Sequence, residues 1–157
     1  MMAAPVAYSR TEMSEPQVFT LEAVNEIIPK LSPIIGKQLE RRGEIERRLF
    51  ALAEELGEVP DEITPEAADT PKVREIKLEL MDRIATYQEG WREVEACGAV
   101  VKDTRMGLID FYGRVEDKLV WLCWKYGEEE CGYYHALNEG FSGRRGIGAS
   151  VRQRLLN

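Results

Sequence analysis

The residues of this 157-residue chain whose types suggest chemistry are few and lie in its C-terminal half. Asp110 is an acid in the middle of the apolar run 108–112, and His135, the single histidine, follows two tyrosines. Glu128 stands in a Gly-Glu-Glu-Glu turn. Two carboxylates and an imidazole form a ligand set that suits Mn, Fe or Zn. The sequence therefore allows a metal-dependent, hydrolase-like enzyme that uses Asp110, Glu128 and His135, although their spacing matches no local metal motif.

Each of these residues also has a simpler structural interpretation. A buried carboxylate costs several kcal/mol unless it is paired, so Asp110 is expected to form a salt bridge with Lys102 or with an arginine. A single histidine after two tyrosines is typical of a packed, hydrogen-bonded core residue, and Glu128 in a turn is typical of a solvated one. We therefore expect no cofactor and favour a protein without catalytic residues, with the metal-dependent enzyme as the alternative.

A second group of candidates could bind an anion. The segment 140–146 reads Gly-Phe-Ser-Gly-Arg-Arg-Gly, and arginine forks suit carboxylate or phosphate. It is not a phosphate loop, because no Gly-Lys-Ser/Thr follows, and a mobile basic tail is the simpler interpretation. Cys123, inside an apolar strand, is expected to be a buried small hydrophobe. The candidate ligand-binding residues are Lys102, Asp110, Trp124, Glu128, His135, Arg144 and Arg145.

The net charge of −7 does not describe the whole molecule. Residues 53–71 hold seven acids and no base, which leaves 21 acids and 21 bases elsewhere. This acidic, proline-containing segment is expected to be a solvated loop, and deleting residues 61–69 is expected to matter little. Nucleic-acid binding requires a broad basic face, which four arginines after residue 140 do not supply.

The remaining composition indicates a folded cytoplasmic protein. A hydrophobic share of 44% excludes wholesale disorder. The longest apolar run, 120–124, is far shorter than the roughly 20 residues that span a bilayer, and the N-terminus does not resemble a secretory signal. Three cysteines without a CxxC pair argue against disulfides and a structural zinc site.

Apolar residues recur in steps of three and four over residues 21–56, which predicts a helix with one apolar stripe. Thr20 is the expected N-cap. Pro29 and Pro33 remove backbone donors, so we expect a kink or a break, with a short helix through residue 28 and a long one from about residue 32.

A second series over residues 73–94 predicts a second helix, with Lys77 as its polar exception and Gly98 as its C-terminal cap. The two helices are predicted to form a coiled-coil-like antiparallel hairpin, in which Leu49 and Ile84 face the other helix. Gln38 and Arg42 interrupt the first stripe. They either set the helix register or lie where the stripe has frayed, and we favour the second interpretation.

After Gly98 the pattern alternates, which predicts strands at 99–102, 108–112, 118–125 and 132–135, with a turn over 113–117. Trp121 and Trp124 should face opposite sides of the third strand. The predicted class is α+β: a helical hairpin over 20–98, including the acidic loop 57–71, with an antiparallel sheet of three to four strands over 99–135 at its open end. Residues 19–147 would form one domain, between a flexible segment 1–18 and a basic C-terminal tail 148–157.

Several short sequence motifs in the C-terminal half occur in a recognisable order. They are Gly-Ala-Val-Val-Lys-Asp at 98–103, Gly-Leu-Ile-Asp-Phe at 107–111, Val-Trp-Leu-Cys-Trp at 120–124, Tyr-His at 134–135 and Glu-Gly-Phe-Ser-Gly-Arg at 139–144. Together with Phe-Thr-Leu-Glu-Ala at 19–23, they make the chain similar to an uncharacterised prokaryotic family, domain of unknown function 2203. The resemblance covers residues 19–147, implies a bacterial protein and the extent of the domain, and brings no activity with it. Tyr134 departs from the tryptophan expected before the histidine.

These observations favour a non-catalytic interaction protein. Its helical hairpin would pair with a second copy to form a homodimer, and a small polar pocket would bind an anionic ligand. No nucleic acid and no membrane is expected as a partner.

Overall fold

The computed structural model describes residues 16–155, which form two long helices followed by a five-stranded antiparallel sheet. The predicted α+β class is confirmed. Residues 1–15 of the predicted flexible segment lie outside the described residues. In chain order the elements are α2 (Leu21–Leu56), α3 (Pro71–Ala96), β1 (Val100–Asp103), β2 (Leu108–Val115), β3 (Lys118–Lys125), β4 (Tyr133–Ala136), the 3-10 turn η1 (Phe141–Gly143), β5 (Arg145–Gly146) and α4 (Ala149–Arg154).

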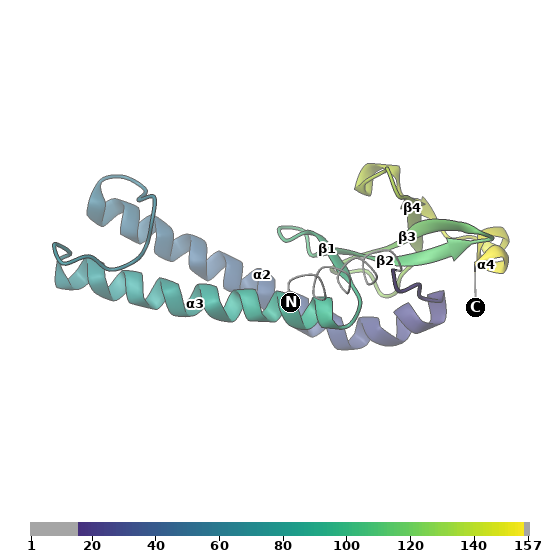
Figure 1. The fold of residues 1–157 in the computed structure, drawn as a ribbon, viewed down its shortest axis with the longest axis horizontal. Helices are drawn as coiled ribbons and strands as arrows, with labels where there is room; N and C mark the ends of the chain where they lie inside the picture. Colours follow the sequence, from purple (N-terminus) through teal and green to yellow (C-terminus); the bar gives the residue numbers. More distant parts are fainter. Residues whose placement is uncertain (1–15, 156–157) are drawn as a thin grey trace, which may run out of the picture.

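Helix α2 is one continuous helix of 36 residues, so the predicted separation into two helices is wrong. Thr20 is the N-cap as predicted, and its hydroxyl accepts a hydrogen bond of 3.0 Å from the Ala23 N–H. Pro29 and Pro33 both lie inside the helix. Figure 1 shows α2 changing direction between its purple first turns and its blue remainder. A bend is the usual consequence of proline inside a helix, so the prolines redirect α2 without ending it.

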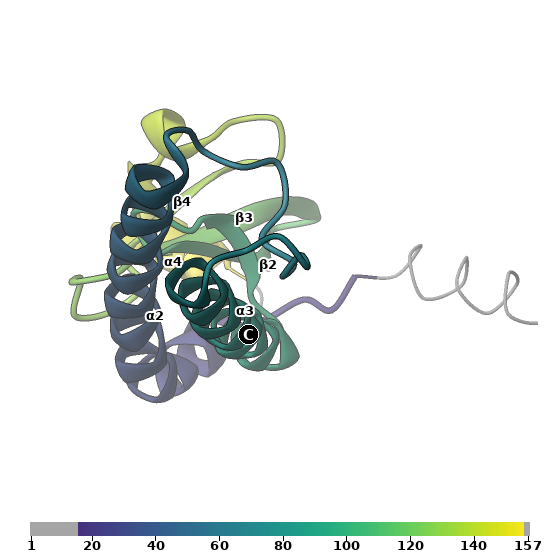
Figure 2. The same ribbon diagram turned by 90° about the vertical axis from the view of Figure 1, so that its left-hand side faces the viewer.

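The bend gives the two halves of α2 different partners. The first half lies against the sheet and belongs to the main core through Leu21, Val24, Ile28, Leu31 and Ile35. The second half lies beside α3 and projects with it away from the sheet (Figure 1). Figure 2, which views the molecule from the free end of the arm, shows the sheet behind the helices. We call residues 38–90 the arm; it has its own small core of Ile45, Leu52, Val73 and Leu80.

Gln38 lies at the base of the arm, where α2 and α3 approach each other closely. Its side chain is fully buried, and its amide nitrogen donates a hydrogen bond of 2.6 Å to the Tyr87 carbonyl. A side chain at Gly90 would collide with the Gln38 amide. The interpretation of Gln38 as part of a frayed stripe is therefore wrong, because Gln38 fixes the spacing and register of the helices.

The acidic segment is a mostly exposed loop, as expected, but it is anchored to the arm at two points that the sequence did not indicate. Ile63 packs against the small core of the arm. The Lys77 ammonium lies 3.0 Å from Oδ2 of Asp69 and donates to the Thr64 carbonyl at 3.2 Å, and both charged side chains are buried. An apolar anchor and a buried ion pair thus hold the loop on α3, and deleting residues 61–69 would remove both.

The sheet has the order β1-β2-β3-β4-β5, with every neighbouring pair antiparallel. The predicted limit of four strands is corrected by β5, which pairs Gly146 with Tyr133 and Arg145 with Tyr134. The β2–β3 hairpin turns at residues 116–117, later than the middle of the predicted turn, so β2 extends to Val115.

The two faces of the sheet have different chemistry. The helix-facing side carries Ile109, Phe111, Leu122 and Trp124, all part of the main core. Alternation places Asp110, Tyr112, Trp121, Cys123 and His135 on the opposite side, which we call the outer face. The predicted opposition of Trp121 and Trp124 is confirmed by their pairing register.

The segment after β5, expected as a basic tail, packs against the sheet as far as residue 155. It contains α4, and the buried Leu155 pairs with Val115 at the end of β2. Ile147 and Val151 pack on the main core. These apolar contacts explain why arginine content alone gave a misleading picture of the segment.

Candidate functional site

A buried polar cluster occupies the middle of the outer face. Oδ2 of Asp110 lies 3.0 Å from the Lys102 ammonium and 3.0 Å from Nε2 of His135. The side chains of Asp110 and His135 are each 1% exposed. The expected salt bridge between Asp110 and Lys102 is therefore confirmed, and His135 is the buried, hydrogen-bonded residue that its sequence context suggested.

The strand register brings these residues together. Asp110 pairs with Cys123 across β2 and β3, while His135 pairs with Trp121 across β4 and β3. The side chains of Asp110 and His135 therefore meet above β3, although their strands are not neighbours. Lys102 reaches the same carboxylate from β1 at the edge of the sheet.

The hydrogen bonds of His135 restrict where its protons can be. Nδ1 lies 3.0 Å from the Ala136 carbonyl oxygen, which can only accept, so this contact is a hydrogen bond in the tautomer that carries its proton on Nδ1. Nε2 then faces a carboxylate oxygen of Asp110 at 3.0 Å. In that tautomer Nε2 presents a lone pair to the carboxylate, so a proton or a cation between the two atoms would make this contact favourable.

Cys123 completes the cluster. Its Sγ, a carboxylate oxygen of Asp110 and a ring nitrogen of His135 all lie within 4.8 Å of one another. Burial raises the pKa of the Cys123 thiol, and the negative charge of Asp110 raises this pKa further. Oδ1 of Asp110 is buried and has no hydrogen-bond partner among residues 16–155. Cys123 was interpreted from the sequence only as a small hydrophobe, so its place beside two ligand-type side chains is a finding of the structure.

Aromatic rings hold Lys102 in position. Its ammonium lies 3.8 Å from the centre of the Trp121 ring, a favourable cation–π contact. Trp121 in turn packs on Tyr112, with ring centres 4.1 Å apart. The Lys102 side chain is 31% exposed, so the cluster meets solvent on this side.

Glu128 and Arg144 form a separate pair. The Arg144 guanidinium donates to both carboxylate oxygens of Glu128, at 2.9 and 2.8 Å, and stacks on the Tyr133 ring. Glu128 also accepts a hydrogen bond of 2.9 Å from the Lys125 backbone. Glu128 is therefore engaged with an arginine and is not part of the three-residue group around His135.

Of the two other predicted site residues, Arg145 lies apart from both groups and Trp124 contacts only the backbone of Glu128. Arg145 is paired with Glu139 at 3.2 Å on the surface. Trp124 is fully buried on the helix-facing side and donates from Nε1 to the Glu128 carbonyl at 3.0 Å. Of the seven candidates, the structure thus unites Lys102, Asp110 and His135, and it pairs Glu128 with Arg144.

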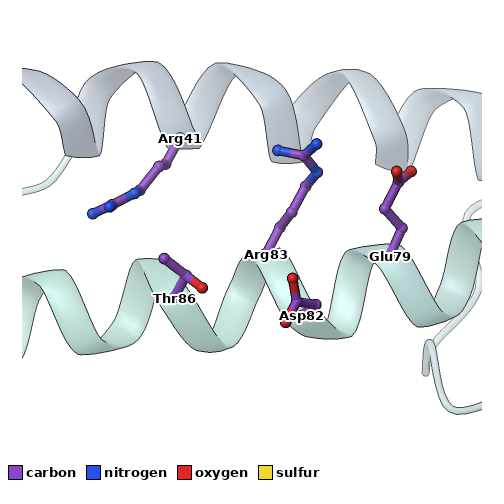
Figure 3. Close-up of a pocket in the computed structure, with 5 residues that line it drawn as sticks. All are labelled: Arg41, Glu79, Asp82, Arg83 and Thr86. Atoms are coloured by element: carbon purple, nitrogen blue, oxygen red, sulfur yellow. The ribbon is translucent and has the colours of Figure 1, made fainter.

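Two of the grooves on the arm lie on opposite sides of the contact between its helices. Figure 3 shows the polar groove, where Arg83 and Glu79 of α3 extend toward α2 and Arg41 extends from α2. This groove has a volume of about 290 Å³. The other groove, of about 360 Å³, is mainly apolar; its lining is Arg42, Ile45, Glu46, Leu49, Ile84, Tyr87 and Gln88.

The structure is an α+β fold with a helical arm and an antiparallel sheet. Its two candidate sites are the apolar groove of the arm and the buried polar cluster on the outer face of the sheet. The chain belongs to the family described as "Uncharacterized conserved protein (DUF2203)", whose model matches residues 17–147. The family resemblance read from the sequence is thus confirmed. No curated protein and no solved structure matches the chain. Among residues 16–155, no helix has the length and apolar character needed to cross a membrane.

Proposed function

We propose that this protein is a non-catalytic interaction protein that forms a homodimer through the apolar groove of its arm. The single observation that carries this proposal is the apolar groove itself, which lies between two helices and is lined by Ile45, Leu49 and Ile84. Two packed helices with an apolar groove offer the ridges and holes that a further helix fills.

Large exposed side chains continue this apolar side along the arm. Phe50, which is 66% exposed, lies four residues after Glu46 of the groove, and Met81 lies three residues before Ile84. Leu78 lies three residues before Met81 and is also exposed. Residues three and four apart share a helix face, so these three side chains extend the groove. Contiguous exposed apolar surface is typical of an interaction site.

The charges at the groove favour a second copy as the partner. Arg42 and Glu46 both line it, one helical turn apart, and form an ion pair of 3.5 Å with each other. In a two-fold symmetric pair, each surface meets itself in the opposite direction. The Arg42–Glu46 pair of one copy would then lie against the same pair of the other, with opposite charges adjacent. A self-complementary pair of charges on an apolar surface suits such an arrangement.

The anionic-ligand part of the hypothesis has less support in the geometry. Lys102, Arg144 and Arg145 each already have a carboxylate partner within the chain. A small anion would have to displace that carboxylate from a bond that is already formed. The metal-dependent enzyme that uses Glu128 meets a similar obstacle, because Arg144 occupies both oxygens of Glu128.

Light scattering after size exclusion, at tens of micromolar protein, tests the homodimer. We expect a dimer for the wild type and a monomer for the double variant Phe50→Glu, Met81→Glu, because both changes place charge on the apolar side. Thr86→Glu is the control for added negative charge, since it places one glutamate at the polar groove and should remain a dimer. A wild-type monomer, or a dimer that survives the double substitution, contradicts the proposal.

A further inference from the structure

The outer-face cluster contains a combination of side chains that the dimer proposal does not use. Within residues 16–155, Asp110, Cys123 and His135 are the one group of three potential metal ligands whose ligand atoms lie this close together. All three side chains are buried. We propose that Asp110, Cys123 and His135 bind one zinc-type divalent transition-metal ion, which ties β2, β3 and β4 together.

The histidine is oriented as a metal ligand requires. Metal-binding histidines usually donate their other ring N–H to a carbonyl or a carboxylate, which fixes the tautomer. Nδ1 of His135 has such an acceptor in the Ala136 carbonyl at 3.0 Å. Nε2 is therefore the nitrogen left to bind an ion, and it lies 3.0 Å from Oδ2 of Asp110.

The carboxylate offers an oxygen that is free for a ligand. Oδ2 of Asp110 serves both Lys102 and His135, while the buried Oδ1 has no partner among the described residues. Buried polar atoms without a partner are uncommon in folded proteins. Together with a thiol and an imidazole, this oxygen makes a mixed N, O, S donor set, which suits Zn²⁺ and the chemically similar Co²⁺.

The charges balance when the ion binds. The Cys123 thiol loses its proton to solvent and Sγ binds the ion as a thiolate; Nε2 of His135 likewise releases its proton and binds through its lone pair. Two positive charges therefore enter as two protons leave, and the charge of the buried cluster is unchanged. The Lys102 ammonium stays on Oδ2 of Asp110, on the partly exposed side of the cluster, while Oδ1 binds the ion.

The site is distinct from the sequence-based metal hypothesis, because Cys123 takes the place of Glu128. The thiolate gives the proposal a direct spectroscopic test, since a cobalt–thiolate bond produces a charge-transfer absorption that oxygen and nitrogen ligands do not. Full-length protein, purified without a histidine tag or chelator, would be titrated with Co²⁺. We expect an intense charge-transfer band that saturates at one ion per chain and disappears when Zn²⁺ displaces the Co²⁺.

Two cysteine variants locate the thiolate. Cys123→Ser should lose the band. Cys131→Ser is the matched control, because Cys131 is also buried, and its Sγ donates to the Cys123 carbonyl at 3.4 Å, yet it is not part of the three-residue group. Cys131→Ser should keep the band. A wild type without the band, or a band that depends on Cys131 instead of Cys123, overturns the proposal.

Lys102→Met decides the question even if the cysteine variants do not fold. The positive charge of the Lys102 ammonium, 3.0 Å from Oδ2 of Asp110, repels a metal ion bound to the same carboxylate. Its removal should therefore make Co²⁺ binding roughly tenfold tighter. A purely structural ion pair predicts no such gain. Unchanged or weaker Co²⁺ affinity in Lys102→Met would show that Asp110 is not a ligand, and the proposal would fail.

Discussion

Lys77 in the arm and Lys102 on the sheet each lie 3.0 Å from an aspartate oxygen, but the two ion pairs differ in their surroundings. The Lys77 side chain is 4% exposed and also donates to the Thr64 carbonyl. Oδ2 of its partner Asp69 accepts a hydrogen bond of 2.7 Å from the Glu66 backbone. Both oxygens of Asp69 are thus hydrogen-bonded, because Oδ1 accepts from Lys77.

The Asp110–Lys102 pair on the sheet differs, because only one of the two oxygens of Asp110 has hydrogen-bond partners among the described residues. Asp110 has one oxygen with two partners and one oxygen without any among the described residues, and a buried thiol lies next to it. The comparison shows that a buried ion pair by itself does not indicate a functional site. A polar group that remains unsatisfied beside potential ligands is the more informative feature.

Apolar packing contributes most to the stability of the arm. Removing a buried apolar side chain there should therefore give the largest loss of stability. Leu80 is fully buried in the small core of the arm, so Leu80→Ala should cost about 2–5 kcal/mol. Leu49→Ala should cost less, since Leu49 is only partly buried and lines the apolar groove. Urea denaturation followed by circular dichroism measures both values. Equal costs would contradict the assignment of Leu49 to the groove.

A smaller loss of stability should separate the two lysines. Lys77→Met leaves Asp69 without its cation, whereas Lys102→Met leaves Asp110 with His135 as a partner. Breaking a buried pair by removing one charge is destabilising because the other charge stays buried. The urea midpoint should therefore fall more for Lys77→Met than for Lys102→Met.

The double variant Lys77→Met, Asp69→Asn is the control for this interpretation. The amide oxygen of the substituted side chain would still accept the hydrogen bond from the Glu66 backbone, and the side chain would carry no charge. The double variant should therefore recover part of the stability that Lys77→Met loses. A double variant no more stable than the single one would mean that an orphaned charge was not the cause.

The sequence predicted the α+β class, most element boundaries and the Asp110–Lys102 pair, but it did not predict that Cys123 joins them. The reason is the β2–β3 turn. Gly113 suggested an early turn, whereas the chain turns at Glu116, a non-glycine residue with a φ of 57°. Gly113 lies inside β2, where a side chain would collide with Leu122. Only with the later turn does Asp110 pair with Cys123.

The loop shows a different limit of sequence reading. Its composition, with seven acids and several prolines, indicates a solvated loop. It does not reveal the two residues that anchor the loop, Ile63 and Asp69. The signal was present on α3, where Lys77 interrupts an apolar stripe. A lysine at a buried helix position requires a nearby carboxylate, and the acidic loop is the segment that supplies it.

The smallest expected effect is a change of stability in acid. It tests whether the Asp69–Lys77 ion pair stabilises the folded arm. The Glu66 backbone N–H holds the pKa of Asp69 below its ordinary value, with further lowering by Lys77. A carboxyl group with a pKa lower in the folded than in the unfolded state contributes stability above its unfolded pKa, and this contribution is lost as the pH falls toward the folded pKa. The melting temperature of the wild type should therefore exceed that of Asp69→Asn at neutral pH. The difference should shrink as the pH falls below about 3.9, the ordinary aspartate value.

The difference between the two proteins is the quantity to follow, because other groups also titrate. Asp103 has a pKa lowered chiefly by the backbone N–H groups of Met106 and Arg105, and it remains in both proteins. Subtracting the two melting curves at each pH removes this shared contribution and leaves that of Asp69. A difference that stays constant down to about pH 3 would mean that Asp69 keeps its ordinary pKa. The loop would then rest on Ile63 rather than on the ion pair, and the contrast with the pair on the sheet would have to be drawn from apolar packing alone.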